Sequence, residues 1–214
     1  MANNTEWYKF VKRITDMSKA EKTKAFIIEK TAPIFNRKGY AGTSINDMTD
    51  ATGLTKGSIY GNFSNKDEVA LAAFDYNLQK ISTIFSTEIS QQDSAKGQLL
   101  VFVHVYMNFL SHPFPSGGCP IMNTAIEADD THPELRKKVV SGIVNWKNRI
   151  TKLIERGIDQ IEFSSTIDPE QIALTIIATI EGGIMITQAT GKLNYLKLIM
   201  KSVEKLINGL SSEN

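Results

Sequence analysis

Apolar residues recur every three or four positions along most of the chain, which is the rhythm of one buried helical face. Between residues 21 and 38 these positions are Ala25, Ile28, Ala32 and Phe35. Pro33 lies inside this segment and predicts a kink, because proline lacks a backbone donor. Gly39 predicts the end of the helix. No stretch has the alternation of a strand, and there is no repeat or low-complexity tract, so the pattern predicts an all-α fold.

Capping and turn residues predict where the other helices begin and end. Ser44, with Asp47 three positions later, is typical of a helix start, and Gly53 predicts a tight turn. Thr55 can cap the next helix, and acidic residues such as Asp67 suit the positive end of a longer one. The remaining predicted helices cover residues 44–52, 56–63, 65–89, 97–110, 120–129, 133–161, 169–190 and 195–210.

The two short helices at 44–52 and 56–63, joined by the turn at Gly53, have the layout of a helix-turn-helix. The second helix of this motif lies in the major groove of DNA. Ile59 and Phe63 are expected to pack inward onto the first helix. The outward positions are Lys56, Gly57, Ser58, Tyr60, Gly61 and Asn62.

Two glycines in the second short helix are unexpected, because each costs roughly 1 kcal/mol relative to alanine. Gly57 and Gly61 lie four positions apart and share a face without side chains. Such a face predicts a close approach, either of this helix to DNA or of another helix to this one. Both explanations are open from the sequence.

Charge and composition narrow the possible partners. Residues 1–66 hold 11 Lys and Arg against 6 Asp and Glu, and residues 67–214 hold 13 against 17, so balances of +5 and −4 make up the net charge of +1. The basic N-terminal part suits a polyanion. No apolar run approaches the roughly 18 to 20 residues that span a bilayer, and no signal peptide is visible, so we expect a cytoplasmic protein without a membrane partner.

The run FNRKGYAGTSINDMTDATGLTKGSIYGNFSNKDEVAL resembles the DNA-binding domain of TetR-family transcriptional regulators. The matching positions are Phe35, Gly39, Tyr40, Thr43, Ser44, Gly53, Thr55, Gly57, Tyr60, Phe63 and Lys66. The resemblance implies a small three-helix N-terminal domain, residues 1–66, and a larger helical ligand-binding and dimerisation domain, residues 67–214. It also implies a homodimer that binds an inverted-repeat operator in double-stranded DNA, responds to a small-molecule effector, and acts most often as a repressor.

The predicted DNA-binding residues lie on and around the second short helix. They are Thr43, Ser44, Thr55, Lys56, Gly57, Ser58, Tyr60, Asn62 and Lys66. Lys56, Lys66 and Tyr60 are expected to contact phosphate, although solvated charges and core packing are the alternatives. Asn62 stands where many relatives have histidine or tyrosine, and asparagine can pair with adenine.

The candidate effector-binding residues are aromatic and polar side chains of the middle helices. They are Phe102, Tyr106, Phe109, Met122, Asn123, Glu127 and Trp146, with His104 as a further polar candidate. Core packing alone would also explain the apolar members. Cys119 has no basic residue within six positions, so we expect an inert thiol.

Dimerisation is predicted through the helices at 169–190 and 195–210. The first helix is apolar on more than one face, and one apolar stripe consists of Ala173, Ile177, Ile180 and Ile184. Gly182 and Gly183 lack side chains and would permit the close approach of a partner helix. Two copies of each helix would then form a four-helix interface about a two-fold axis.

Motifs for catalysis or metal binding are missing from the sequence. The three histidines have no metal-ligand spacing, and neither a Gly-rich phosphate loop nor a G-x-S-x-G turn occurs, so we expect no catalytic residues, metal or cofactor. A small helical enzyme, with Cys119 as nucleophile and His104 or His112 as base, or a ligand-binding module without DNA affinity, is the alternative. The N-terminal segment, residues 1–20, carries Trp7 and basic residues and is either a packed helix or a basic arm.

Overall fold

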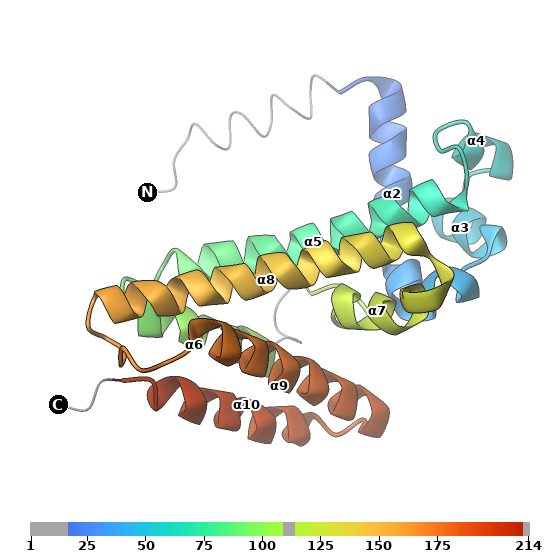
Figure 1. The fold of residues 1–214 in the computed structure, drawn as a ribbon. Helices are drawn as coiled ribbons and strands as arrows, with labels where there is room; N and C mark the ends of the chain where they lie inside the picture. The colour runs from blue at the N-terminus through green and yellow to red at the C-terminus, as the bar shows by residue number, and fades with distance from the viewer. Residues whose placement is uncertain (1–16, 109–113, 212–214) are drawn as a thin grey trace. The chain divides into compact units, whose positions relative to one another are not determined.

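The computed structural model describes residues 17–108 and 114–211, and the regular structure in these ranges is helical (Figure 1). The helices are α2 (Lys19–Gly42), α3 (Ile45–Thr52), α4 (Lys56–Tyr60), α5 (Lys66–Ile89), α6 (Ala95–Met107), α7 (Pro120–Thr131), α8 (Pro133–Asp159), α9 (Pro169–Thr190) and α10 (Leu193–Asn208). The predicted all-α fold is confirmed. The question of a packed helix or basic arm before residue 17 lies outside the described residues, as does Phe109.

Local signals explain most helix ends. Ser18 forms a capping box with Glu21, so α2 begins slightly before the predicted start. The backbone of α2 leaves the helical range at Gly39 (φ 73°, ψ 178°), where two helical stretches meet at a kink, while Pro33 lies within the first stretch. The break therefore falls at glycine, which tolerates positive φ, rather than at proline.

The N-terminal compact unit ends at Tyr76, inside α5. Its core combines side chains from four helices and the turn before α5: Ile27, Ala32, Phe35, Met48, Ile59, Phe63, Val69, Ala70 and Ala73. The first turns of α5 thus belong to this unit, because their apolar side chains complete its core. The sequence predicted a domain boundary between residues 66 and 67, at the start of α5, whereas the compact unit extends ten residues further, to Tyr76.

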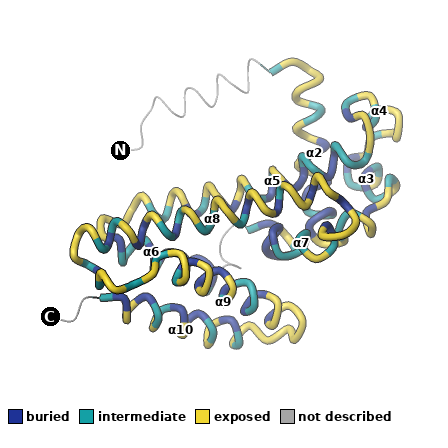
Figure 2. Tube along the Cα trace, viewed as in Figure 1, coloured by how far each residue is buried: buried dark blue, intermediate teal, exposed yellow. Residues whose placement is uncertain are grey.

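The C-terminal compact unit, residues 77–214, is a helical bundle. Helix α9 packs against α8 and α10, α6 packs against α8 and α10, and α7 packs against α8. Helices α9 and α10 run side by side (Figure 1), and buried and exposed residues alternate along both (Figure 2). A Cβ atom at Gly183 would lie 3.2 Å from Leu196, so this glycine permits the close packing of α9 on α10.

The stripe predicted to contact a partner helix is buried inside the chain. Ala173, Ile177, Ile180 and Ile184 expose at most 8% of their surface. That prediction of the contact residues is wrong, because these side chains fill the bundle core. Among the described residues, α9 is the one helix long and apolar enough to span a membrane, so its length and composition depart from the expectation of no such segment. Its buried stripe is typical of a core helix.

Candidate nucleic-acid interface and interior cluster

The turn between α3 and α4 is built from the local signals read in the sequence. Ser44 Oγ accepts a hydrogen bond from the Asp47 amide (3.1 Å), and the Asp47 carboxylate accepts one from the Ser44 amide (2.8 Å). Gly53 ends α3 in the left-handed conformation (φ 68°). Thr55 Oγ1 accepts from the Ser58 amide (3.1 Å) and caps α4. The predicted caps and turn are confirmed, and α4 stops at Tyr60, earlier than predicted.

Helix α4 has an apolar side and a solvent side. Ile59 and Phe63 are buried, as predicted. Thr55, Lys56 and Gly57 are exposed at the N-terminal end of α4, next to its unsatisfied amides. Ser58, Tyr60, Asn62 and Lys66 are partly exposed, and Tyr60 also packs against the core. The N-terminal end of α4 therefore projects bare backbone and a lysine into solvent.

The two glycines of this segment differ in their surroundings. A Cβ atom at Gly57 would meet only the Thr55 hydroxyl, 3.9 Å away. A Cβ atom at Gly61 would lie 3.2 Å from the Gly57 carbonyl oxygen. Close packing by another described helix does not account for Gly57, so the explanation by approach of an external partner is the one the surroundings favour.

Other predicted DNA-binding residues already have contacts within the chain. Thr43 is fully buried, and its hydroxyl donates to the Gly39 carbonyl (2.6 Å), a structural role that removes it from the surface. The Asn62 amide nitrogen donates to the Ser58 carbonyl (2.9 Å). The Lys66 ammonium lies 4.3 Å from the centre of the Tyr40 ring. Asn62 and Lys66 stay predictions that require these contacts to exchange for contacts with DNA.

Two ion pairs connect α2 with the helices on either side of α4, and neither of them involves Lys56. Lys24 Nζ lies 2.7 Å from the Glu68 carboxylate, and the hydrogen bond from Lys24 is the main cause that lowers the pKa of Glu68 to about 2. Lys38 Nζ lies 2.6 Å from the Asp47 carboxylate and likewise lowers its pKa. Lys56 forms no ion pair with a described residue. Its charge is therefore free to meet an anion.

The C-terminal unit contains a chain of aromatic rings. Phe85 stacks on Phe102 with ring centres 4.8 Å apart. The Tyr106 ring lies 5.4 Å from Phe85, 5.6 Å from Phe114 and 6.0 Å from Trp146. The structure thus brings together Phe102, Tyr106 and Trp146, three of the residues predicted to bind an effector.

The remaining predicted effector residues lie on α7 and elsewhere. The Asn123 amide donates to the Gly117 carbonyl (2.7 Å), so it holds the loop before α7. Met122 and Glu127 are partly buried on α7, and His104 is exposed on α6. In the residues that the structure describes, no group of His, Cys, Asp and Glu side chains could hold a metal ion.

Sequence reasoning missed Glu181 on α9, a residue beside this aromatic chain. Both of its carboxyl oxygens are buried, and among the described residues only the thiol of Cys119, a weak donor, opposes the cost of that burial. Burial raises the pKa of Glu181 to about 7. The available signal was a single acid in the middle of the apolar segment IALTIIATIEGGIMIT.

Cys119 and Tyr106 are the ionisable neighbours of Glu181. Burial, with Glu181 as a further cause, raises the pKa of the Cys119 thiol well above its usual value, as the expectation of an inert thiol requires. The pKa of Tyr106 is raised by burial, by Cys119 and by Glu181. The Trp146 indole nitrogen is also buried without an acceptor among the described residues. We call Tyr106, Cys119, Trp146 and Glu181 the interior cluster.

These features define a helix-turn-helix protein with a separate helical bundle. The profile "Bacterial regulatory proteins, tetR family" matches residues 27–73, and "Tetracyclin repressor-like, C-terminal domain" matches residues 95–203. The solved structure of a TetR-family regulator from Cytophaga hutchinsonii is 46% identical, with a TM-score of 0.89, and the match covers 93% of this chain and 100% of that one. The chain belongs to the TetR family of transcriptional regulators.

Two curated relatives agree with this assignment. An uncharacterized HTH-type transcriptional regulator in the lacX 3' region of Lactococcus lactis subsp. lactis is 28% identical over 190 residues, which are 86% of this chain and 94% of the relative. The HTH-type transcriptional repressor DhaR of Mycobacterium sp. strain GP1 is 25% identical over 162 residues, which are 74% of this chain and 79% of the relative.

Proposed function

We propose that this protein is a ligand-responsive repressor that binds an inverted-repeat operator as a homodimer. The observation that carries the DNA-binding part is the exposed N-terminal end of α4, where Lys56 and the bare backbone at Gly57 follow the Thr55 cap. Backbone amides at a helix N-terminus favour phosphate, and a helix without a side chain can approach the groove closely. Repression follows the name of the relative DhaR, and the proposed site of action is the cytoplasm, because the profile that matches residues 27–73 describes bacterial regulatory proteins.

The substitution Gly57→Ala tests the close approach. Space around Gly57 is open, so the variant should fold normally and gain up to about 1 kcal/mol from helix propensity. Its affinity for a duplex carrying the promoter of its own gene should nevertheless fall about tenfold or more in a fluorescence anisotropy titration. Thermal unfolding of the same variant is the control. An unchanged affinity for DNA would show that the backbone of α4 at Gly57 does not approach DNA closely.

Dimerisation is proposed through the outward face of α9 and a neighbouring part of α10. Leu174, Ala178, Gly182 and Met185 lie on this face of α9, and Leu174 and Met185 are 46% and 53% exposed. A Cβ atom at Gly182 would meet nothing within 4 Å, so a partner helix can approach there. Leu198 of α10 is 59% exposed. A helix that is apolar on both sides is best explained by burial on both.

A charge placed on this face should separate the subunits. Leu174→Glu is expected to lower the mass measured by light scattering towards that of a monomer at micromolar concentration, because it would bury an unpaired carboxylate in a two-fold interface. Ile126→Glu is the matched control, since Ile126 on α7 is 84% exposed. A dimer that persists in Leu174→Glu would disprove this choice of interface.

Effector binding is proposed for the C-terminal unit. Helix α5 is proposed to transmit the effect of the ligand to the DNA-binding unit, because α5 contributes residues to both units. A ligand changes DNA affinity only by its differential affinity for two arrangements of the dimer. Successive major grooves on one side of DNA recur at about 34 Å, so a change in the spacing of the two α4 helices would weaken binding. Footprinting on the promoter should therefore show two protected half-sites that are inverted repeats.

A further inference from the structure

The carboxyl group of Glu181 lies under the loop that precedes α7. Gln188, seven positions further along the same face of α9, donates from its amide nitrogen to the Gly117 carbonyl (2.7 Å), which holds the loop on α9. Cys119 follows in that loop and lies close enough to Glu181 for each to influence the pKa of the other. Tyr106 on α6 lies beside the same segment, because its ring centre is 5.6 Å from that of Phe114, and Cys119 and Glu181 both raise its pKa.

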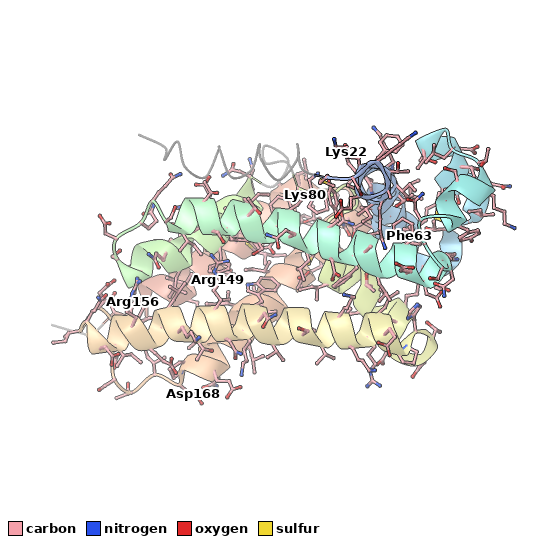
Figure 3. The ribbon with its side chains drawn as sticks, turned by 90° about the horizontal axis from the view of Figure 1, so that it is seen from above. Lys22, Phe63, Lys80, Arg149, Arg156 and Asp168 are labelled. Carbon is pink, nitrogen blue, oxygen red and sulfur yellow. The ribbon has the colours of Figure 1, made fainter. Side chains whose placement is uncertain are left out.

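Folding alone does not explain an acid at this position. A buried carboxylate costs stability unless a cation or several donors compensate for it. Burial is the main influence on the pKa of Glu181, and only the Cys119 thiol, a weak donor, opposes it. Arg149 on α8 instead donates to Ser86 Oγ on α5 (3.4 Å), and Figure 3 shows it on the side of α8 towards α5. An apolar residue in place of Glu181 would stabilise the ligand-free protein.

The surroundings of this carboxyl suit a positively charged ligand with an apolar body. Tyr106 places its ring 5.6 Å from Phe114 and 6.0 Å from Trp146, and aromatic faces attract cations. As whole residues Glu181 and Trp146 keep a small exposed part, whereas the Glu181 carboxyl oxygens and the Trp146 indole nitrogen are buried.

We propose that Glu181 is the anchor for an organic cation, an amine or quaternary ammonium compound with an aromatic or aliphatic body, that packs against Tyr106 and Trp146. This inference rests on the proposed function, because it names the chemical class of the effector. The ligand supplies the positive charge that no described residue places beside the carboxylate.

A matched pair of probes separates charge from shape. Benzyltrimethylammonium carries a permanent positive charge, and neopentylbenzene is its neutral counterpart of nearly the same shape. Isothermal titration calorimetry on the full chain should show the cation binding at least about tenfold more tightly than the neutral compound. Glu181→Gln should abolish this preference, and Glu170→Gln, at the exposed acid of the same helix, should keep it. Equal affinity for both probes in the unchanged protein would overturn the proposal.

The affinity for the permanent cation should also depend on pH. Because the pKa of Glu181 is about 7, the carboxylate is largely protonated at pH 6 and largely ionised at pH 8, so affinity should rise about tenfold between them. Cys119 and Tyr106 stay protonated in this range, since their pKa values are raised, and the probe itself does not titrate. Glu181→Gln should remove the dependence. A pH-independent affinity in the unchanged protein would contradict the role of Glu181.

A DNA titration keeps this proposal separate from the proposed function. Glu181→Gln without probe should bind the promoter duplex as the unchanged protein does, and benzyltrimethylammonium should release DNA from the unchanged protein only. If the protein binds DNA but no cation, the effector class is wrong while the regulator stands. If it binds the cation but no DNA, the cation site stands while the proposed repressor function fails.

Discussion

The cost of burying Glu181 can be measured as a pH-dependent stability difference. The pKa of this carboxyl is raised from 4.5 to about 7 in the folded protein. Between these values the folded state holds a proton that the unfolded state releases, so the free energy of unfolding falls as pH rises through this window. The difference between the two pKa values corresponds to about 3 kcal/mol, which is lost above pH 7.

The substitution Glu181→Gln removes this titration while keeping the shape of the side chain. Urea unfolding of both proteins at pH 5 and pH 8, at one protein concentration, measures the difference in the free energy of unfolding at each pH. We expect the variant to gain about 3 kcal/mol relative to the unchanged protein on going from pH 5 to pH 8. Cys119 and Tyr106, whose pKa values Glu181 raises, are buried and stay protonated in the folded protein over this range, and the other groups titrate equally in both proteins, so their contributions cancel.

Glu170→Gln on the same helix is the control, because Glu170 is exposed and pairs with Lys147 at the surface. A surface ion pair contributes little, so this variant should show the same difference at both pH values. The reasoning about Glu181 is refuted if Glu181→Gln also shows a constant difference. Such a result would mean that the carboxyl is solvated or paired in solution.

Three further substitutions examine other parts of the structure. Lys56→Ala should weaken binding to all duplexes and reduce the slope of log affinity against log salt by about one, since it removes one phosphate contact; an unchanged slope excludes that contact. If Asn62 exchanges its hydrogen bond to the Ser58 carbonyl for one to adenine, Asn62→Ala should relax the sequence preference at one base pair in a competition assay. An unchanged preference would mean that Asn62 has only a structural role. Gly157→Ala should lower the free energy of unfolding by about 1–3 kcal/mol in urea, because its Cβ would lie 2.1 Å from the Phe163 ring; normal stability would show that the ring can move.

The sequence by itself determined the local architecture of the DNA-binding unit. Ser44, Gly53 and Thr55 mark the ends of α3 and α4 because a cap or a left-handed turn depends on residues within about four positions of each other. The burial of Ile59 and Phe63 follows equally from their helical spacing. Such interactions can be predicted from a short stretch of sequence, because they do not depend on the rest of the chain.

Only the tertiary structure decided which surfaces are buried and which residues meet. Helix α9 is apolar on more than one side, so its sequence does not reveal that Ile177 faces the core of its own bundle while Leu174 lies on the outer surface of the chain. Thr43 was predicted to bind DNA, yet it is buried and its hydroxyl donates to the Gly39 carbonyl. Tyr106, Cys119 and Glu181 are far apart in sequence. They form one cluster because helix packing, which depends on long-range contacts, brings α6, the loop before α7 and α9 together.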